Sequence, residues 1–204
     1  FQPAEALKRD IGKVLACGFQ VAVHAIGDQT NRTVLDALEQ AMPSYPENPG
    51  RHRIEHSQIL DKADVARFSQ LDIIAAMQPT HATSDMYWAG ERLGPQRLQY
   101  AYAWRSLLDS GARLALGSDF PVEKVNPMLG LHAAVTRQDT QGWPEGGWQP
   151  QERISRAEAL RGFTLDAAWA GFMENEVGSL SPGKFADFVV LDRDIMSVPE
   201  SEIA

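Results

Sequence analysis

The sequence has a single cysteine among its 204 residues, and it has neither a long apolar run nor a block of basic residues. One cysteine allows no internal disulfide. No apolar stretch approaches the roughly 20 residues that a bilayer-spanning helix needs, so we expect no membrane partner. The 19 basic residues are dispersed among 27 acidic ones, for a net charge of −8. This balance argues against nucleic acid as a partner. Hydrophobic residues make up 44%, an ordinary share for a globular domain.

The first 18 residues predict a helix from the middle of a protein rather than its start. Apolar residues recur there at helical spacing, and Gly18 is a typical helix stop. Cys17 belongs to this apolar stretch, so we expect it in the core rather than acting as a nucleophile. Because Phe1 is not a translation start, we expect missing sequence upstream, including any targeting signal. The sequence therefore does not identify the cellular compartment, and we expect the cytoplasm.

Short apolar runs then alternate with longer stretches of helical periodicity. We expect strands at Phe19–His24, His52–His56, Ile73–Met77 and Leu114–Ser118. Helices are expected over Asp28–Ala41, from about Asp61, around Leu98–Ser110 and over Met128–Arg137. A long polar and aromatic loop is expected after the third strand. This alternation predicts a parallel sheet with helices on its faces.

The predicted fold class is α/β, with about four βα units of a TIM-type (β/α)8 barrel. A doubly wound sheet fits the alternation as well, but no Gly-rich phosphate turn follows any of the strands. Because a complete barrel needs about 250 residues, we expect only its C-terminal half here. We assign residues 1–175 to this partial barrel. Residues 176–204 are expected to begin a small β-sandwich, with a strand at Phe188–Leu191.

A further helix is predicted just before this β-structured segment. Ser155 and Glu158 form a capping box at its start, and Leu160 and Phe163 are expected to face inward.

Three polar residues stand at the C-terminal ends of predicted strands, where barrel enzymes gather their active sites. They are His24, His56 and Asp119. Imidazole nitrogens and a carboxylate are the ligands of a catalytic zinc, which lowers the pKa of a water molecule toward about 7. Alternatively, each residue is a structural group satisfied by its neighbours. The pattern alone leaves both interpretations open.

The remaining histidines differ in position. His52 begins its strand, and His132 lies within a helix, so we expect structural roles for both. His81 follows the third strand on the reactive side, where substrate contact and simple packing are equally plausible.

Five segments together resemble the amidohydrolase superfamily. They are VHAIGDQTNRTVLDALE, RHRIEHSQIL, MQPTH, GSDFPV and GSLSPGKFADFVVLD. More narrowly, they are similar to metal-dependent hydrolases related to N-substituted formamide deformylase. The resemblance implies a metal-binding barrel whose fifth- and sixth-strand histidines are His24 and His56. It also implies that Asp119 is the eighth-strand metal ligand and general base. One or two divalent ions, most typically zinc, and small-molecule substrates with amide or other C–N bonds are implied too.

Two parts of the family's ligand set have no counterpart here. The first-strand His-x-His pair and the fourth-strand carboxylated lysine are both expected upstream of Phe1. We therefore expect this chain to be inactive alone, and to need the other half of the barrel or to self-associate. Two alternatives stay open for the whole protein. One is a non-catalytic binding or regulatory protein, and the other is a metal-dependent hydrolase of esters or lactones.

Overall fold

The computed structural model describes residues 3–204, which form two compact units. Of the described residues, the first unit comprises 3–76 and Tyr100–Arg113, and the second comprises Met77–Gln99 and Leu114–Ala204. Among the described residues, no helix is both long and apolar enough to cross a bilayer.

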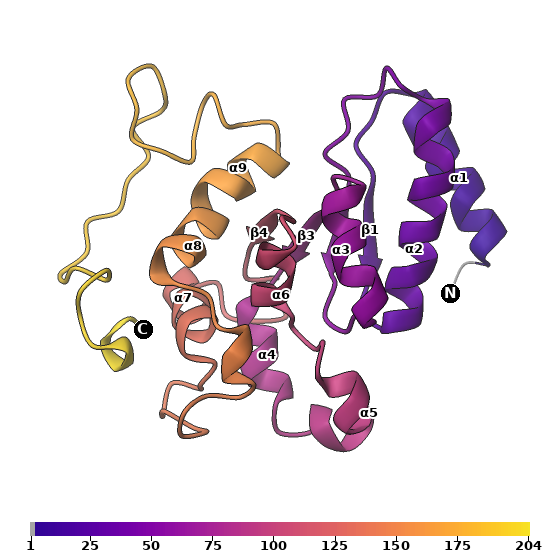
Figure 1. The fold of residues 1–204 in the computed structure, drawn as a ribbon. Helices are drawn as coiled ribbons and strands as arrows, with labels where there is room; N and C mark the ends of the chain where they lie inside the picture. Colours follow the sequence, from indigo (N-terminus) through magenta and orange to yellow (C-terminus); the bar gives the residue numbers. More distant parts are fainter. Residues whose placement is uncertain (1–2) are drawn as a thin grey trace. The chain divides into compact units, whose positions relative to one another are not determined.

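The first unit is built from βα repeats. Its elements are α1 (Ala4–Ala16), β1 (Ala22–Ala25), α2 (Asp28–Ala41), the short η1 (Met42–Ser44), β2 (Arg53–His56), α3 (Lys62–Gln70), most of β3 (Ile74–Met77) and α6 (Trp104–Asp109). β1 pairs with β2 and β2 with β3, both in parallel. Helices α1 and α2 lie side by side (Figure 1). The alternation predicted from the sequence is therefore confirmed, with strand ends shifted by at most three residues.

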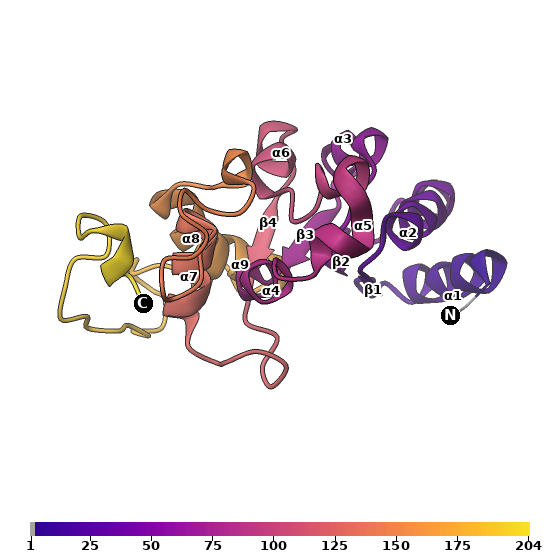
Figure 2. The same ribbon diagram turned by 90° about the horizontal axis from the view of Figure 1, so that it is seen from below.

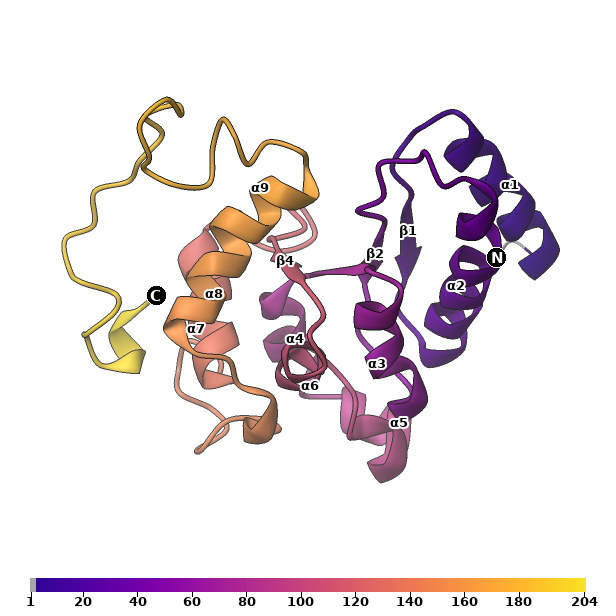
Figure 3. The same cartoon turned by 45° about the horizontal axis from the view of Figure 1, so that its top comes forward.

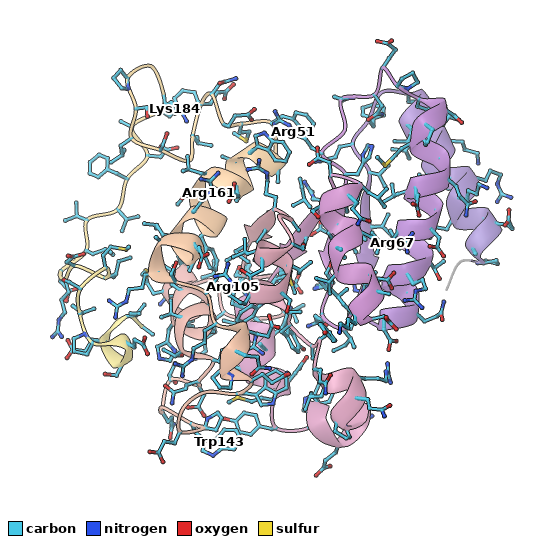
Figure 4. All side chains as sticks on the ribbon, in the orientation of Figure 1. Arg51, Arg67, Arg105, Trp143, Arg161 and Lys184 are labelled. Atoms are coloured by element: carbon cyan, nitrogen blue, oxygen red, sulfur yellow. The ribbon has the colours of Figure 1, made fainter. Side chains whose placement is uncertain are left out.

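The core of this unit comes from the inner faces of the helices and the continuous apolar strands. Leu35 and Leu38 on α2, Ile54 on β2 and Phe68 on α3 are all fully buried. Strands covered on both faces are expected to be apolar throughout, as β3 is. Between the helices, Arg67 of α3 forms ion pairs with Asp36 and Glu39 of α2; Figure 4 labels Arg67 beside α2.

The regular structure of the second unit is mostly helical. It contains α4 (Pro79–Asp85), α5 (Ala89–Leu98), β4 (Leu114–Leu116), α7 (Pro127–Thr136), η2 (Pro150–Glu152), α8 (Arg156–Arg161), the π-helical turn η3 (Gly162–Asp166), α9 (Ala167–Ala170) and η4 (Glu200–Glu202). Helices α7 and α8 lie side by side (Figure 2). After β4, the N–H of Gly117 donates to the carbonyl of Met77, at the end of β3, at 3.1 Å. The strands are thus hydrogen-bonded in the order β1-β2-β3-β4.

Three helix starts have capping side chains, and the capping box of α8 is the one predicted from the sequence. Asp61 caps α3 by accepting from the N–H of Ala63. Asn126 caps α7, with Pro127 as its first residue. Ser155 and Glu158 form the complete capping box of α8.

Three expectations about local structure are wrong. The segment after β3 is not a loop but contains α4 and α5. Cys17 is exposed rather than buried. Helix α1 turns Ile11 and Leu15 inward, and a residue two positions after Leu15 lies about 200° further around the helix. Leu160 is also exposed, although Phe163 on the following turn packs against Gly130.

The expected strand at residues 188–191 is not formed. A strand requires hydrogen bonds to a neighbouring strand, and this segment pairs with none in the described part of the chain. Figure 3 shows the segment after α9 running without regular structure until η4. Its apolar side chains are exposed, with Val190 at 83%. The proposed domain boundary at residue 175 remains a prediction.

Candidate metal centre

His24 and His56 come together in the first unit at the ends of adjacent parallel strands. In the register of β1 and β2, Ala25 lies opposite His56, so His24 and His56 are offset by one residue. Their rings meet edge to face, with centroids 4.6 Å apart and planes at 75°. His24 is exposed and His56 half-buried, so both rings are accessible. The two imidazoles are therefore close enough to serve together as nitrogen donors.

The backbone at the end of β2 is unusual. His56 has φ +79° and Ser57 has φ +47°, in the left-handed region that residues with a side chain seldom occupy. The N–H of Ser57 donates to the carbonyl of Ala25, and its hydroxyl donates to the carbonyl of Ile54. The first bond joins the turn to the neighbouring strand β1, and the second joins it to the end of β2 itself. They therefore help to fix the direction in which His56 leaves the sheet.

His81 and Asp119 form a second pair, in the second unit. Helix α4 begins two residues after β3, and His81 lies on its first turn with only 8% of its surface exposed. Its Nε2 lies 3.1 Å from Oδ2 of Asp119. Asp119 follows β4 by three residues and has φ +59°. The turn is closed by the N–H of Val122, which donates to the Asp119 carbonyl at 2.8 Å.

Glu123 was not singled out from the sequence, yet it belongs to this cluster. Its Oε1 lies 3.6 Å from Nδ1 of His81 and accepts a hydrogen bond from the hydroxyl of Ser84 at 2.6 Å. His81 therefore has a carboxylate on each side of its ring. The available signal was a second acidic residue four positions after Asp119, directly after the GSDFPV segment. Its closeness to His81 depends on helix α4, which was not predicted from the sequence.

The two histidines predicted to be structural are buried. His52 is 2% exposed, and its Nδ1 accepts a hydrogen bond from the N–H of Val21 at 3.1 Å. His132 is 4% exposed within α7. Burial lowers the pKa of both, against the opposing effect of nearby carboxylates. Neither belongs to the described donor pairs.

The donor chemistry fits a divalent metal. The first unit offers two imidazoles, and the second offers a carboxylate with an imidazole against it. These nitrogen and oxygen donors are the types that zinc and similar ions bind in hydrolases. The predicted site residues are thus gathered as two pairs, His24 with His56 and His81 with Asp119. Which residues bind metal and which contact substrate remain predictions.

Comparison with known proteins places the chain in a family. Residues 2–204 match the amidohydrolase family. Protein LONG AFTER FAR-RED 3 of Arabidopsis thaliana is 44% identical over 175 residues, covering 85% of this chain and 30% of that protein. The putative amidohydrolase YtcJ of Bacillus subtilis (strain 168) is 35% identical over 200 residues, covering 98% and 37%. N-substituted formamide deformylase of Arthrobacter pascens is 31% identical over 190 residues, covering 91% and 34%.

A solved structure gives the same result for the fold. An uncharacterized metal-dependent hydrolase from Pyrococcus horikoshii OT3 is 30% identical with a TM-score of 0.84, covering 98% of this chain and 39% of that one. The chain spans 30–37% of the length of the three curated relatives. These matches confirm the resemblance seen in the five segments, agree with an α/β chain that is half of a barrel, and support a divalent metal as cofactor. The chain belongs to the amidohydrolase family.

Proposed function

We propose that the complete protein is a zinc-dependent hydrolase that cleaves amide or other C–N bonds of a small molecule. The observation that carries this proposal is the His24–His56 pair, two imidazoles held 4.6 Å apart at the ends of adjacent parallel strands. The similarity to N-substituted formamide deformylase supports a C–N bond as the target. The metal-dependent hydrolase from Pyrococcus horikoshii supports the requirement for a metal.

Each residue has a distinct role in this proposal. A bound divalent metal would acidify a water molecule and polarise the substrate carbonyl. His24, His56 and Asp119 would hold the metal. Asp119 would also accept a proton from the attacking water and return it to the leaving nitrogen. His81, whose Nε2 contacts Asp119, would contact the substrate, with Glu123 on the other side of its ring.

The donor assignment is tested by metal analysis of the 204-residue chain. The chain is stripped with chelator, reconstituted with zinc, desalted and compared with a His24→Ala/His56→Ala double variant. Zinc retained by the wild type and lost in the variant is the expected result. Equal zinc in both proteins would contradict the assignment of the pair.

The proton-transfer role is tested in the full-length protein. Asp119→Asn preserves shape but removes the basic oxygen, so turnover of formamide and other amide substrates should fall at least about a hundredfold. Asp139→Asn is the matched control, because it makes the same change in a carboxylate elsewhere in the second unit that is half-buried, as Asp119 is. Near-normal turnover by Asp119→Asn would contradict the role given to Asp119. The 204-residue chain alone should show no turnover.

A further inference from the structure

Asn31 makes an unusual set of contacts beneath the His24–His56 pair. It lies on the first turn of α2 and is completely buried. Its Nδ2 lies within hydrogen-bonding distance of four backbone carbonyls, those of Ala25, Ile26, Gly27 and Ile59, at 3.0–3.3 Å. With two hydrogens, one amide group is thus shared among four acceptors.

These carbonyls lie at the end of β1 and in the two turns that follow β1 and β2. Ala25 directly follows His24, and it is the residue that lies opposite His56 in the sheet. Ile59 lies three residues after His56, and its N–H donates to the carbonyl of Ile26 at 2.9 Å. Asn31 therefore connects the turn after β1 to the turn after β2. The spacing between the histidines depends on how these turns are held.

The other end of the amide indicates why an asparagine stands here. Its Oδ1 is buried and has no hydrogen-bond partner. A buried acceptor without a partner opposes folding, and an apolar side chain of the same size would avoid that cost. What only the amide contributes at this position is its N–H donors toward the two turns.

We propose that Asn31 is a positioning residue that sets the separation and angle of the His24 and His56 rings for joint metal binding. The inference rests on the proposed function for its metal, but its geometric part concerns the metal-free chain. Asn31 does not itself contact either ring in this proposal. It acts through the backbone of the turns that carry the rings.

The first unit contains a matched control. Asn48 makes a similar amide connection, donating from Nδ2 to the carbonyls of Leu15 and Phe19, both at 3.1 Å. Phe19 precedes β1, so this connection lies at the opposite end of the strand from His24. Replacing Asn48 disturbs the packing of the same unit without touching the turns after the histidines.

The test compares zinc affinity in the 204-residue chain, measured by competition with a chromophoric chelator, with thermal unfolding followed in parallel. Asn31→Leu, which keeps the size and removes the donors, should weaken zinc binding about tenfold or more. Asn31→Ser, which keeps one donor, should give an intermediate affinity and is the milder variant. Asn48→Leu should lower the unfolding temperature and leave zinc affinity at the wild-type value.

Two results would overturn the proposal. One is wild-type zinc affinity in a folded Asn31→Leu variant, and the other is an equal loss in Asn48→Leu. If the wild-type chain binds no zinc, the donors in this chain are not sufficient to hold the metal, and NMR of the metal-free chain decides the positioning claim. Nuclear Overhauser contacts between the two rings should be present in the wild type and lost in Asn31→Leu. Ring contacts that persist unchanged in Asn31→Leu would refute the positioning role of Asn31.

Discussion

His52 predicts the clearest dependence of stability on pH. The side chain is almost completely buried, and its Nδ1 accepts a hydrogen bond from the N–H of Val21. An imidazole nitrogen can accept only when it carries no proton. Burial lowers the pKa of His52 below its ordinary value of 6.5, while the nearby Asp72 carboxylate opposes the shift. The folded chain therefore holds this histidine neutral at pH values where the unfolded chain protonates it.

The sign of the effect follows from proton uptake. Below pH 6.5, the ordinary value, the unfolded state binds a proton at His52 that the folded state does not. Stability therefore falls with acid until the pH reaches the folded-state pKa. The slope in this window is at most about 1.4 kcal/mol per pH unit from this one residue. Above the ordinary pKa both states are neutral, and His52 contributes no pH dependence.

Urea unfolding of the wild type and His52→Leu, between about pH 5 and 8, isolates this contribution. Leucine has no titrating group and leaves the N–H of Val21 without its acceptor, which costs about 1–3 kcal/mol at every pH. The variant should therefore be less stable near neutral pH but lose less stability in acid. The difference between the two proteins narrows as the pH falls. Parallel pH profiles would refute the reasoning.

Two further predictions concern packing and charge. Gly130→Ala places a Cβ 2.5 Å from Cζ of Phe163, so thermal unfolding should show a loss of about 1–3 kcal/mol. Gly90→Ala in α5 meets only an ordinary contact at 3.8 Å and should instead stabilise by about 0.5–1 kcal/mol. Asp64→Asn weakens bonds from two arginines, at 2.9 and 3.0 Å, to a carboxylate that is 2% exposed. Urea unfolding should show that Asp64→Asn lowers the free energy of unfolding by about 3 kcal/mol, whereas the exposed Asp10→Asn changes it little. Similar losses in the two variants would contradict this prediction.

The pairing of His24 with His56 could be predicted because it depends on features that sequence periodicity reports well. Two apolar strands one βα unit apart are neighbours in a parallel sheet, and their C-terminal ends lie at the same edge. The residues at the C-terminal ends of the two predicted strands, His24 and His56, are then close to each other. The helix starts at Asp61 and Ser155 could be predicted as well, because capping depends on side chains within a few residues of each other.

The contact between His81 and Glu123 could not be predicted in this way. Helix α4 is seven residues long and begins at Pro79, with a polar sequence that has no apolar stripe. In α5, Gly94 has φ +70° and Pro95 follows it, so the helical pattern is interrupted. Such short helices are stabilised by packing rather than by their own propensity. The expected strand at residues 188–191 is absent for the opposite reason. Its residues favour a strand, but it pairs with no neighbouring strand in the described part of the chain.

His56 and Asp119, predicted as ligands from different strands, share one backbone property. Both have positive φ, at +79° and +59°, whereas His24 lies within β1. A left-handed conformation costs a residue with a side chain about 1–2 kcal/mol, and glycine escapes that cost. Replacing His56 by glycine should relieve the strain, while His24→Gly only adds the flexibility of glycine to a strand. Urea unfolding should therefore find His56→Gly more stable than His24→Gly by about 1 kcal/mol, with Asp119→Gly also tolerated. An equal or reversed order would show that the turns carry no such strain. The expected order would mean that histidine and aspartate stand at these turns at a cost to stability, which a role in metal binding explains.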